Sequence, residues 1–402
     1  MNLSFSIVKT RKRCAVCDSV HLEEVFDLPR LPLTGRYSSD PIAGFVDDGI
    51  DQKLLWCPQC FHAQLAFQVD PQELYNEEYY FRTSRSQTAC RGVEFFLTAL
   101  NEFFPQRFFQ CALDLGCNDL YLLQQLKGRT AQRYGIDPIW RGKEGTVKGP
   151  SLTVFGETIE DIDLDGKFET APDLIVCRHT LEHIYQPREA LEKFFHAAQP
   201  GAVFVIEVPS LNALVHRLRF DQVFHQHLQY FTYFSLKKMM SQVGAEYIGH
   251  CQNYHDWGSV CMVFVKGSKT YLSEGKKLGE GFDLAFLKNR YAVFQNQMRA
   301  AREVLMLFKN EVIYGYGAAQ MLPILSYHMN NDFSLLAGVL DDDPRLHQWH
   351  YWNLPLQIEK PQIIKDWSST NIFLTAVDNV QPILNRLFTH RPRHIIYPLN
   401  VI

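Results

Sequence analysis

Cys111-Ala-Leu-Asp114-Leu-Gly116-Cys117-Asn118-Asp119 is the stretch that decides the fold of this chain of 402 residues. Its apolar first half is typical of a buried strand, Gly116 marks a turn, and a helical pattern follows at Tyr121 to Leu126. Strand, glycine turn and helix in this order present backbone N–H groups at the carboxyl edge of a parallel sheet, where doubly wound folds bind ligands. The spacing is not G-x-G-x-x-G, which argues against a dinucleotide.

The same alternation of strand and helix continues along the chain. Arg133 to Pro138 predicts a second strand, and its Asp137 is placed to accept hydrogen bonds from a ribose diol. Asp173 to Cys177 and Ala202 to Val208 predict two more strands, with a helix around 187–198 between them. This alternation predicts an α/β fold, a parallel sheet with helices on both faces.

Two C-x-x-C pairs stand in front of this block, at Cys14/Cys17 and at Cys57/Cys60. Each pair points two thiolates at one spot, and two pairs complete the four-sulfur tetrahedron that suits Zn²⁺. Four sulfur ligands leave no open coordination position, so we predict a structural metal. The other reading is four ordinary thiols that happen to be spaced in pairs.

Composition limits the partners. The formal net charge of −4 offers no excess of basic groups for nucleic acid, and no apolar run approaches the ~20 residues that cross a membrane. The first thirteen residues lack the order of a secretory signal, so we expect a cytoplasmic protein in a reducing compartment. Oligomeric state is not encoded in these patterns, and we expect a monomer or a weak homo-oligomer.

A second strand-glycine-helix pattern lies near the C-terminus, at Val312 to Gln320, and a predicted strand ends in Asp341. It indicates a second Rossmann-like unit. Its glycine loop either holds a phosphate of a ligand or is a purely architectural turn, because the third glycine is missing. The predicted domains are therefore 1–70 with zinc, 71–270 with the first sheet, and 271–402 with a helical connection and the second sheet.

Four motifs of the central block together resemble a class I methyltransferase domain: Asp114 to Asp119, Gly135 to Pro138, Arg178 to His183 and Glu207 to Pro209. With the four cysteines and the segment Phe224-His225-Gln226-His227, the whole chain resembles the sugar C-methyltransferases that act on nucleotide-linked 4-keto-deoxyhexoses. The resemblance implies a zinc-binding N-terminal domain, a class I methyltransferase (Rossmann-like) domain that uses S-adenosylmethionine, and a C-terminal Rossmann-like α/β domain.

The resemblance also implies a mechanism. A base removes the C3 proton beside the C4 ketone, an enediolate forms, and that carbon attacks the sulfonium methyl group. Four positions depart from the family pattern: Phe224 replaces a tyrosine, Gln226 a glutamate, Phe81 a tyrosine, and Leu120 the glycine after Asp119.

The predicted catalytic residues are His227 as the base, with His225, Tyr79 and Gln226 as hydrogen-bond donors. His225 and His227 alternate, so we expect them to face different ways. His183 is expected to pack on a helix face. The predicted cofactor residues are Asp114, Gly116, Asn118, Asp119, Asp137 and His179.

Three functions stay open at this point. The first is C-methylation at C3 of a nucleotide-linked 4-keto-deoxysugar. The second is methyl transfer to an oxygen or nitrogen acceptor, where no carbon acid is ionised. The third is a catalytically impaired homologue that binds nucleotide sugar or S-adenosylmethionine without turnover.

Overall fold

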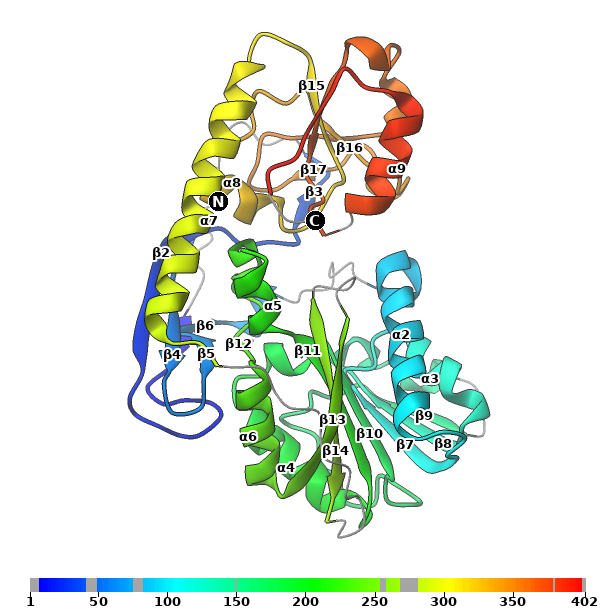
Figure 1. Cartoon of the computed structure of the whole chain (residues 1–402). Coiled ribbons are helices and arrows are strands. Elements are labelled where there is room, and N and C mark those ends of the chain that lie inside the picture. Colours follow the sequence, from blue (N-terminus) through cyan, green and yellow to red (C-terminus); the bar gives the residue numbers. More distant parts are fainter. Residues whose placement is uncertain are drawn as a thin grey trace.

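The computed structural model describes residues 7–40, 49–74, 82–147, 149, 151–253, 258–267, 281–378 and 380–399. A large sheet of the central segment lies below a smaller sheet of the C-terminal segment, and strands of the N-terminal segment stand beside them (Figure 1). The long helix α7 (Leu284–Leu307) runs along the N-terminal strands up to the C-terminal sheet (Figure 1).

The central sheet has seven strands in the order β13-β14-β11-β10-β7-β8-β9. Its strands are β7 (Phe109–Leu115), β8 (Thr130–Ile136), β9 (Leu152–Phe155), β10 (Leu174–Arg178), β11 (Val203–Pro209), β13 (Ala245–Asn253) and β14 (Ser259–Lys266). The pairings from β9 to β11 are parallel, and β14 runs antiparallel to both of its neighbours. The apolar runs that predict strands in the sequence are the buried inner strands of this sheet.

Helices cover both faces of the central sheet, as predicted. The helices of this part are α2 (Gln87–Phe103), α3 (Tyr121–Gln125), α4 (Pro187–Ala197), α5 (Leu211–His216) and α6 (Tyr233–Val243). Successive side chains of a strand point to opposite faces, so Leu113 joins α4 and α6 in one apolar cluster whereas Ala112 joins α2 and α3 in another. The predicted α/β class is therefore confirmed.

The N-terminal segment forms a four-stranded sheet in the order β12-β5-β4-β2. Its elements are β2 (Glu23–Leu31), β4 (Ile50–Cys57), β5 (His62–Leu65) and β12 (Gln229–Tyr230), with β1 (Ile7–Thr10) pairing β6 (Phe67–Val69) beside it and α1 (Pro71–Leu74) following. Strand β12 comes from far along the chain, directly after the segment 224–227. The N-terminal sheet is thus completed by the segment that carries the predicted catalytic residues.

The C-terminal segment forms a five-stranded parallel sheet in the order β18-β16-β15-β19-β20. Its elements are β15 (Ile313–Tyr316), α8 (Leu322–Met329), β16 (Val339–Leu340), β18 (Ile358–Glu359), β19 (Asn371–Leu374), α9 (Val380–His390) and β20 (His394–Ile396). A small pair, β3 (Tyr37–Ser38) with β17 (His350–Tyr351), joins this part to the N-terminal segment.

Helix α7 connects the parts through its predicted apolar stripe. Leu287, Tyr291, Phe294 and Met298 are all buried, and the ring of Tyr291 stacks on Phe26 of β2 with centroids 3.7 Å apart. Short 3-10 helices complete the fold: η1 (Thr83–Arg85), η2 (Leu126–Gly128), η3 (Pro138–Trp140), η4 (Glu144–Thr146), η5 (Leu181–His183), η6 (Phe220–Gln222), η7 (Pro361–Ile363) and η8 (Trp367–Ser369). None of the helices in the described part of the chain is long and apolar enough to cross a membrane.

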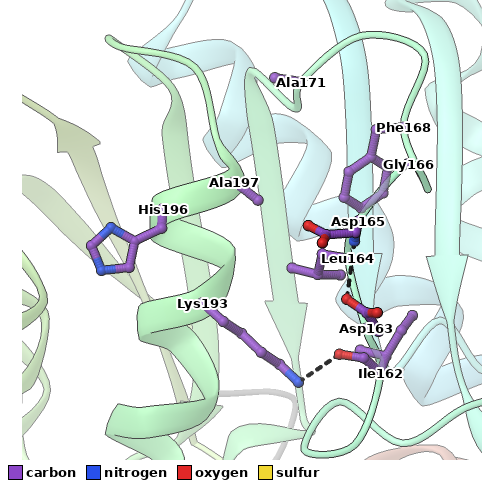
Figure 2. Close-up of a pocket in the computed structure, with 10 residues that line it drawn as sticks. All are labelled: Ile162, Asp163, Leu164, Asp165, Gly166, Phe168, Ala171, Lys193, His196 and Ala197. Carbon is purple, nitrogen blue, oxygen red and sulfur yellow. Dashed lines mark hydrogen bonds between the residues drawn. The ribbon is translucent and has the colours of Figure 1, made fainter.

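A cavity of about 570 Å³ lies between α4 and the loop that precedes β10 (Figure 2). Asp163, Asp165, Lys193 and His196 supply its polar groups, and the ammonium of Lys193 donates to the carbonyl of Ile162 at 3.1 Å. The cavity reaches Ala171, just before β10 begins, so it lies at the amino edge of the sheet. None of the predicted site residues lines it.

Candidate functional site

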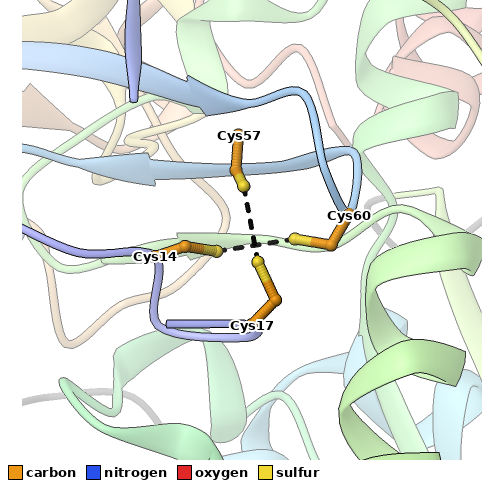
Figure 3. Close-up of side chains that lie close together, drawn as sticks. All are labelled: Cys14, Cys17, Cys57 and Cys60. Carbon is orange, nitrogen blue, oxygen red and sulfur yellow. Dashed lines mark hydrogen bonds between the residues drawn. The ribbon is translucent and has the colours of Figure 1, made fainter. Parts of the chain in front are cut away.

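The four cysteines converge on one point, as the sequence predicts (Figure 3). Their sulfur atoms lie within 4.8 Å of one another, with Cys14 and Cys60 3.5 Å apart and Cys17 and Cys57 3.5 Å apart. Four thiolates at about 2.3 Å from one Zn²⁺ have sulfur atoms about 3.8 Å apart. The donor set therefore fits a closed tetrahedral zinc site.

Both cysteine pairs are held by the same turn. The N–H of Asp18 donates to the carbonyl of Cys14 at 3.0 Å, and the N–H of Phe61 donates to the carbonyl of Cys57 at 2.9 Å. Asp18 and Phe61 each follow the second cysteine of their pair, and each adopts a left-handed conformation with φ of 61° and 57°. Matching turns present the two thiol pairs in the same way.

Gly116 ends the first strand of the central sheet under a tight steric constraint. Its φ is +78°, and a Cβ atom there would lie 2.0 Å from Oγ1 of Thr180. A side chain is therefore excluded both by the backbone conformation and by the neighbouring segment. The glycine lets the loop after β7 pack directly on the segment after β10.

Asp137 sits at the end of β8 and holds this loop. One carboxylate oxygen accepts the N–H of Asn118 at 2.9 Å, and the other accepts the N–H of Ile139 at 3.0 Å. Burial raises the pKa of Asp137, and the two N–H donors oppose that shift. A carboxylate has about four lone-pair positions, so Asp137 can still accept ribose hydroxyls.

Asn118 and Asp119 connect the loop to the segment that enters α2. The side-chain oxygen of Asn118 accepts the N–H of Thr83 at 3.2 Å, and one oxygen of Asp119 accepts the N–H of Ser84 at 3.0 Å. The second oxygen, Oδ1 of Asp119, is buried with no hydrogen-bond partner among the described residues. It is therefore available to accept a donor from a bound molecule. Tyr79 and Phe81 lie outside the described residues.

Leu120 occupies the position where the family carries glycine, and it adopts the left-handed conformation with φ of 67°. Its side chain is 4% exposed and belongs to the apolar cluster between the sheet and α2 and α3. The leucine therefore packs into the core. Asp114, two residues before Gly116, is also buried, and burial raises its pKa to about 7 although Arg178 opposes the shift.

An arginine, a histidine and two glutamates meet where β10 and β11 end. Arg178 forms an ion pair with Glu207, and His179 lies between two carboxylates, 3.6 Å from Glu182 and 3.7 Å from Glu207. Burial alone would raise the pKa of Glu207, but Arg178 and His179 outweigh it and hold that pKa below its usual range. Glu207 also accepts the hydroxyl of Ser259 at 2.7 Å.

His225 points into the N-terminal sheet. Its Nε2 lies 2.9 Å from the carbonyl of Leu31, which can only accept, so Nε2 carries the proton. Its Nδ1 then accepts from the amide of Gln52 at 3.5 Å. Burial lowers the pKa of His225 to about 4. Both ring nitrogens thus brace the segment 224–227 against the N-terminal sheet.

His227 faces the other way, toward η5. Its ring centroid lies 4.9 Å from that of His183 and 4.3 Å from that of Phe224. Burial, together with the positive charges of His183 and His179, holds the pKa of His227 well below its ordinary value. The imidazole of His227 is therefore neutral near neutral pH.

Two residues of this site, Glu182 and His183, were not predicted from the sequence. His183, expected to pack on a helix face, instead lies 2.8 Å through its Nδ1 from the carbonyl of Gln226, and its ring meets His227. Glu182 is 1% exposed and groups with these two histidines, with ligand atoms within 4.8 Å of one another. The only available signal was that Glu182 and His183 follow His179 in one motif.

Two protein-family models match the chain. One, described as "Methyltransferase domain", covers residues 81–250, and the other, described as "Putative zinc binding domain", covers residues 14–75. They confirm the methyltransferase domain and the zinc-binding module that the sequence predicts. S-adenosylmethionine and zinc, the two predicted cofactors, agree with these two matches.

The chain is also similar to individual proteins. It shares 22% identity over 261 residues with C-methyltransferase NovU of Streptomyces niveus, which is 64% of this chain and 61% of NovU, less than two thirds of that relative. N-methyltransferase NodS from Bradyrhizobium japonicum with bound S-adenosyl-L-homocysteine is 15% identical, with a TM-score of 0.36 over 49% of this chain and 96% of NodS. Magnesium protoporphyrin IX methyltransferase from Synechocystis is 13% identical, with a TM-score of 0.35 over 45% of this chain and 84% of that one.

Proposed function

We propose that the chain methylates C3 of a nucleotide-linked 4-keto-deoxysugar, because a methyltransferase-domain model and a zinc-binding-domain model match it and it is similar to a C-methyltransferase. S-adenosylmethionine supplies the electrophilic methyl group on its sulfonium. The similarity to NovU, whose name is that of a C-methyltransferase, favours carbon as the acceptor atom. Two departures from the family pattern, Phe224 and Gln226, stand in the same segment as the proposed base, so the acceptor is the part of the proposal that needs testing first.

The observation that carries the proposal is the position of His227. It is buried and neutral, and it meets His183 in η5. The same segment, through Thr180, packs on Gly116 of the cofactor loop. A proton acceptor thus lies against the segment that packs on the proposed cofactor loop, and this supports deprotonation followed by methyl transfer.

The reaction assigns one step to each group. His227 takes the C3 proton, and the electrons of the C–H bond move into the enediolate formed with the C4 ketone. The C3 carbon then attacks the methyl group as the bond between sulfur and methyl breaks. We assign the amide of Gln226 to donate toward the enediolate oxygen, as an oxyanion donor does. His225 contributes by holding this segment against the N-terminal sheet.

In this proposal, the loop after β7 and Asp137 at the end of β8 bind S-adenosylmethionine. We assign Asp137 to the ribose hydroxyls, and the unpartnered oxygen of Asp119 to a donor on the cofactor. His179 closes the pocket where β10 ends, and Asn118 shapes the loop. Cys14, Cys17, Cys57 and Cys60 would hold Zn²⁺ in a closed four-sulfur site, which stabilises the sheet that β12 completes.

The test is mass spectrometry of a panel of nucleotide-linked 4-keto-deoxysugars after incubation with the purified chain and methyl-labelled S-adenosylmethionine. We expect a labelled methyl group bound to carbon. His227→Asn should abolish the product while the Kd for S-adenosylmethionine changes by no more than about twofold, because His227 is assigned to the proton and not to the cofactor.

Each alternative function gives a distinct result. Label on oxygen or nitrogen would replace the proposal with another acceptor class. Tight binding of S-adenosylmethionine with no label on any sugar would indicate a homologue that has lost turnover. Undiminished product with His227→Asn would remove His227 from the role of base.

A further inference from the structure

Glu182 is a buried carboxylate for which the fold alone gives no reason. Its side chain is 1% exposed, and neither carboxylate oxygen has a hydrogen-bond partner. Burying an ionised carboxylate without hydrogen bonds costs several kcal/mol unless a positive charge compensates it. A charge on Glu182 would therefore need a positive group beside it.

Histidines surround this carboxylate. Nδ1 of His179 lies 3.6 Å from Oε1 of Glu182, and ring nitrogens of His183 and His227 lie within 4.8 Å of the carboxylate. The titratable groups facing it from every adjoining element are Cys177, His179, His183, His227 and Tyr230, with Glu207 and Arg178 beyond His179. Any proton that enters this cluster places a positive charge close to Glu182.

Glu182 and His227 are held in one frame. The N–H of Leu228 donates to the backbone carbonyl of Glu182 at 2.7 Å. Since the carbonyl of Gln226 can only accept, Nδ1 of His183 carries the proton in their 2.8 Å hydrogen bond. These bonds on either side of His227 fix its segment against η5, which keeps the carboxylate beside the imidazole.

We propose that Glu182 is the positioning carboxylate of this site, which stabilises the imidazolium that forms when His227 accepts the C3 proton. The inference rests on the proposed function. Burial disfavours a charged His227, so an unassisted imidazole here would be a weak base. Glu182 supplies a carboxylate next to the base. The segment 224–227 has no carboxylate of its own, because Gln226 carries an amide. The proton passes to solvent after the product leaves, so no further reactant is required.

Glu182→Gln tests this role, because it removes the charge and keeps the shape. We expect kcat to fall about 100-fold, with the KM for sugar and the Kd for S-adenosylmethionine within about threefold of wild type. The acidic limb of the rate profile, where the base becomes protonated, should move to lower pH because the pKa of His227 falls. Glu192→Gln, which removes an exposed carboxylate from α4, is the matched control and should leave both unchanged.

A readout without turnover keeps this test separate from the proposed function. In protein labelled at histidine, NMR titration should show that the pKa of His227 falls by at least about one unit in Glu182→Gln, since a nearby negative charge favours the imidazolium. His225, which contacts Leu31 and Gln52, is the internal control and should not move. This titration tests the role of Glu182 even if the protein methylates no sugar.

Three outcomes would overturn the role. One is an unchanged titration of His227 in the folded Glu182→Gln variant. Another is a second equivalent of zinc in the wild-type protein that disappears in the variant, which would make Glu182 a metal ligand. If Glu182→Gln does not fold, Glu182→Asp keeps the charge at a greater distance. We then expect an intermediate fall in kcat, and wild-type kcat with a wild-type pH profile would contradict the role.

Discussion

Two loops of the molecule share a glycine after one strand and an aspartate after a neighbouring strand, but they differ in their surroundings. In the central sheet Gly116 follows β7, and Asp137 at the end of the next strand accepts the N–H of Asn118 at 2.9 Å. In the C-terminal sheet Gly317 follows β15, and Asp341 accepts the N–H of Ala318 at 2.6 Å. Burial raises the pKa of both aspartates.

The difference lies in what fills the space beside each loop. The C-terminal loop is closed by protein: Tyr37 donates to the carbonyl of Ala318 and Tyr351 to that of Ala319, each at 2.9 Å. A Cβ atom at Gly317 would lie 2.2 Å from that of Ala376. The central loop keeps a buried oxygen of Asp119 without a partner. The glycine turn alone therefore does not make a binding site, and these contacts favour the architectural reading of the C-terminal loop.

The largest expected effect comes from removing the zinc site of the N-terminal segment. The N-terminal segment pairs with β12, which follows the segment 224–227, and Tyr37 of the N-terminal segment donates to the C-terminal loop. Cys57→Ser should therefore lose zinc and soluble protein together, because three sulfur ligands no longer close the tetrahedron. Elemental analysis and yield of soluble protein measure both. One equivalent of zinc retained in the variant would refute the assignment of the site.

The two loops should also differ in how the stability of the protein depends on pH near them. Asp114 lies two residues before Gly116, whereas Gly315 stands at the matching position before Gly317. Burial raises the pKa of Asp114 from 3.8 to about 7, so its contribution to stability is present below pH 4 and lost as the pH rises through 7. Asp114→Asn stays neutral. Its free energy of unfolding, relative to wild type, should rise between pH 4 and 8 by a few kcal/mol, on the order of 4 at most.

Urea unfolding of wild type and Asp114→Asn at both pH values measures this difference. Leu113→Val, a neighbouring buried change without a charge, is the control and should show a difference from wild type that does not depend on pH. Parallel pH dependence of Asp114→Asn and wild type would mean that the carboxyl titrates at its ordinary value.

The sequence was informative where burial and local turns decide the structure. The strands near Leu113, Ile175 and Val205 follow from apolar runs, and the four cysteines follow from their spacing. The pairing of β12 with β5 was not predictable, because a two-residue strand has no pattern of its own. Nor was the meeting of Glu182 with His227, which depends on contacts between segments that are distant along the chain.

The next comparison replaces the aspartate beside each loop, Asp137 or Asp341, with asparagine. Asp137→Asn should weaken S-adenosylmethionine binding about 100-fold, close to 2.8 kcal/mol, because an amide is a poorer acceptor for the ribose and for the loop. Asp341→Asn should leave that Kd unchanged and lower the free energy of unfolding by about 1–2 kcal/mol. Calorimetric titration and urea unfolding separate the two effects. Equal losses of affinity would show that both loops serve the cofactor.

The smallest effect concerns one aromatic donor in each loop. Nε1 of Trp140 donates to the carbonyl of Asn118 at 2.7 Å, as the hydroxyl of Tyr351 does to Ala319. Tyr351→Phe leaves a buried carbonyl with one donor fewer. The free energy of unfolding should therefore fall by about 1 kcal/mol, with no change in the Kd for S-adenosylmethionine. Trp140→Phe should instead raise the Kd for S-adenosylmethionine severalfold, because the carbonyl it holds belongs to the loop to which we assign cofactor binding. If Tyr351→Phe also weakened the binding of S-adenosylmethionine, the C-terminal loop would be coupled to the central site. The hydroxyl contacts of the C-terminal loop would then have to be counted as part of that site.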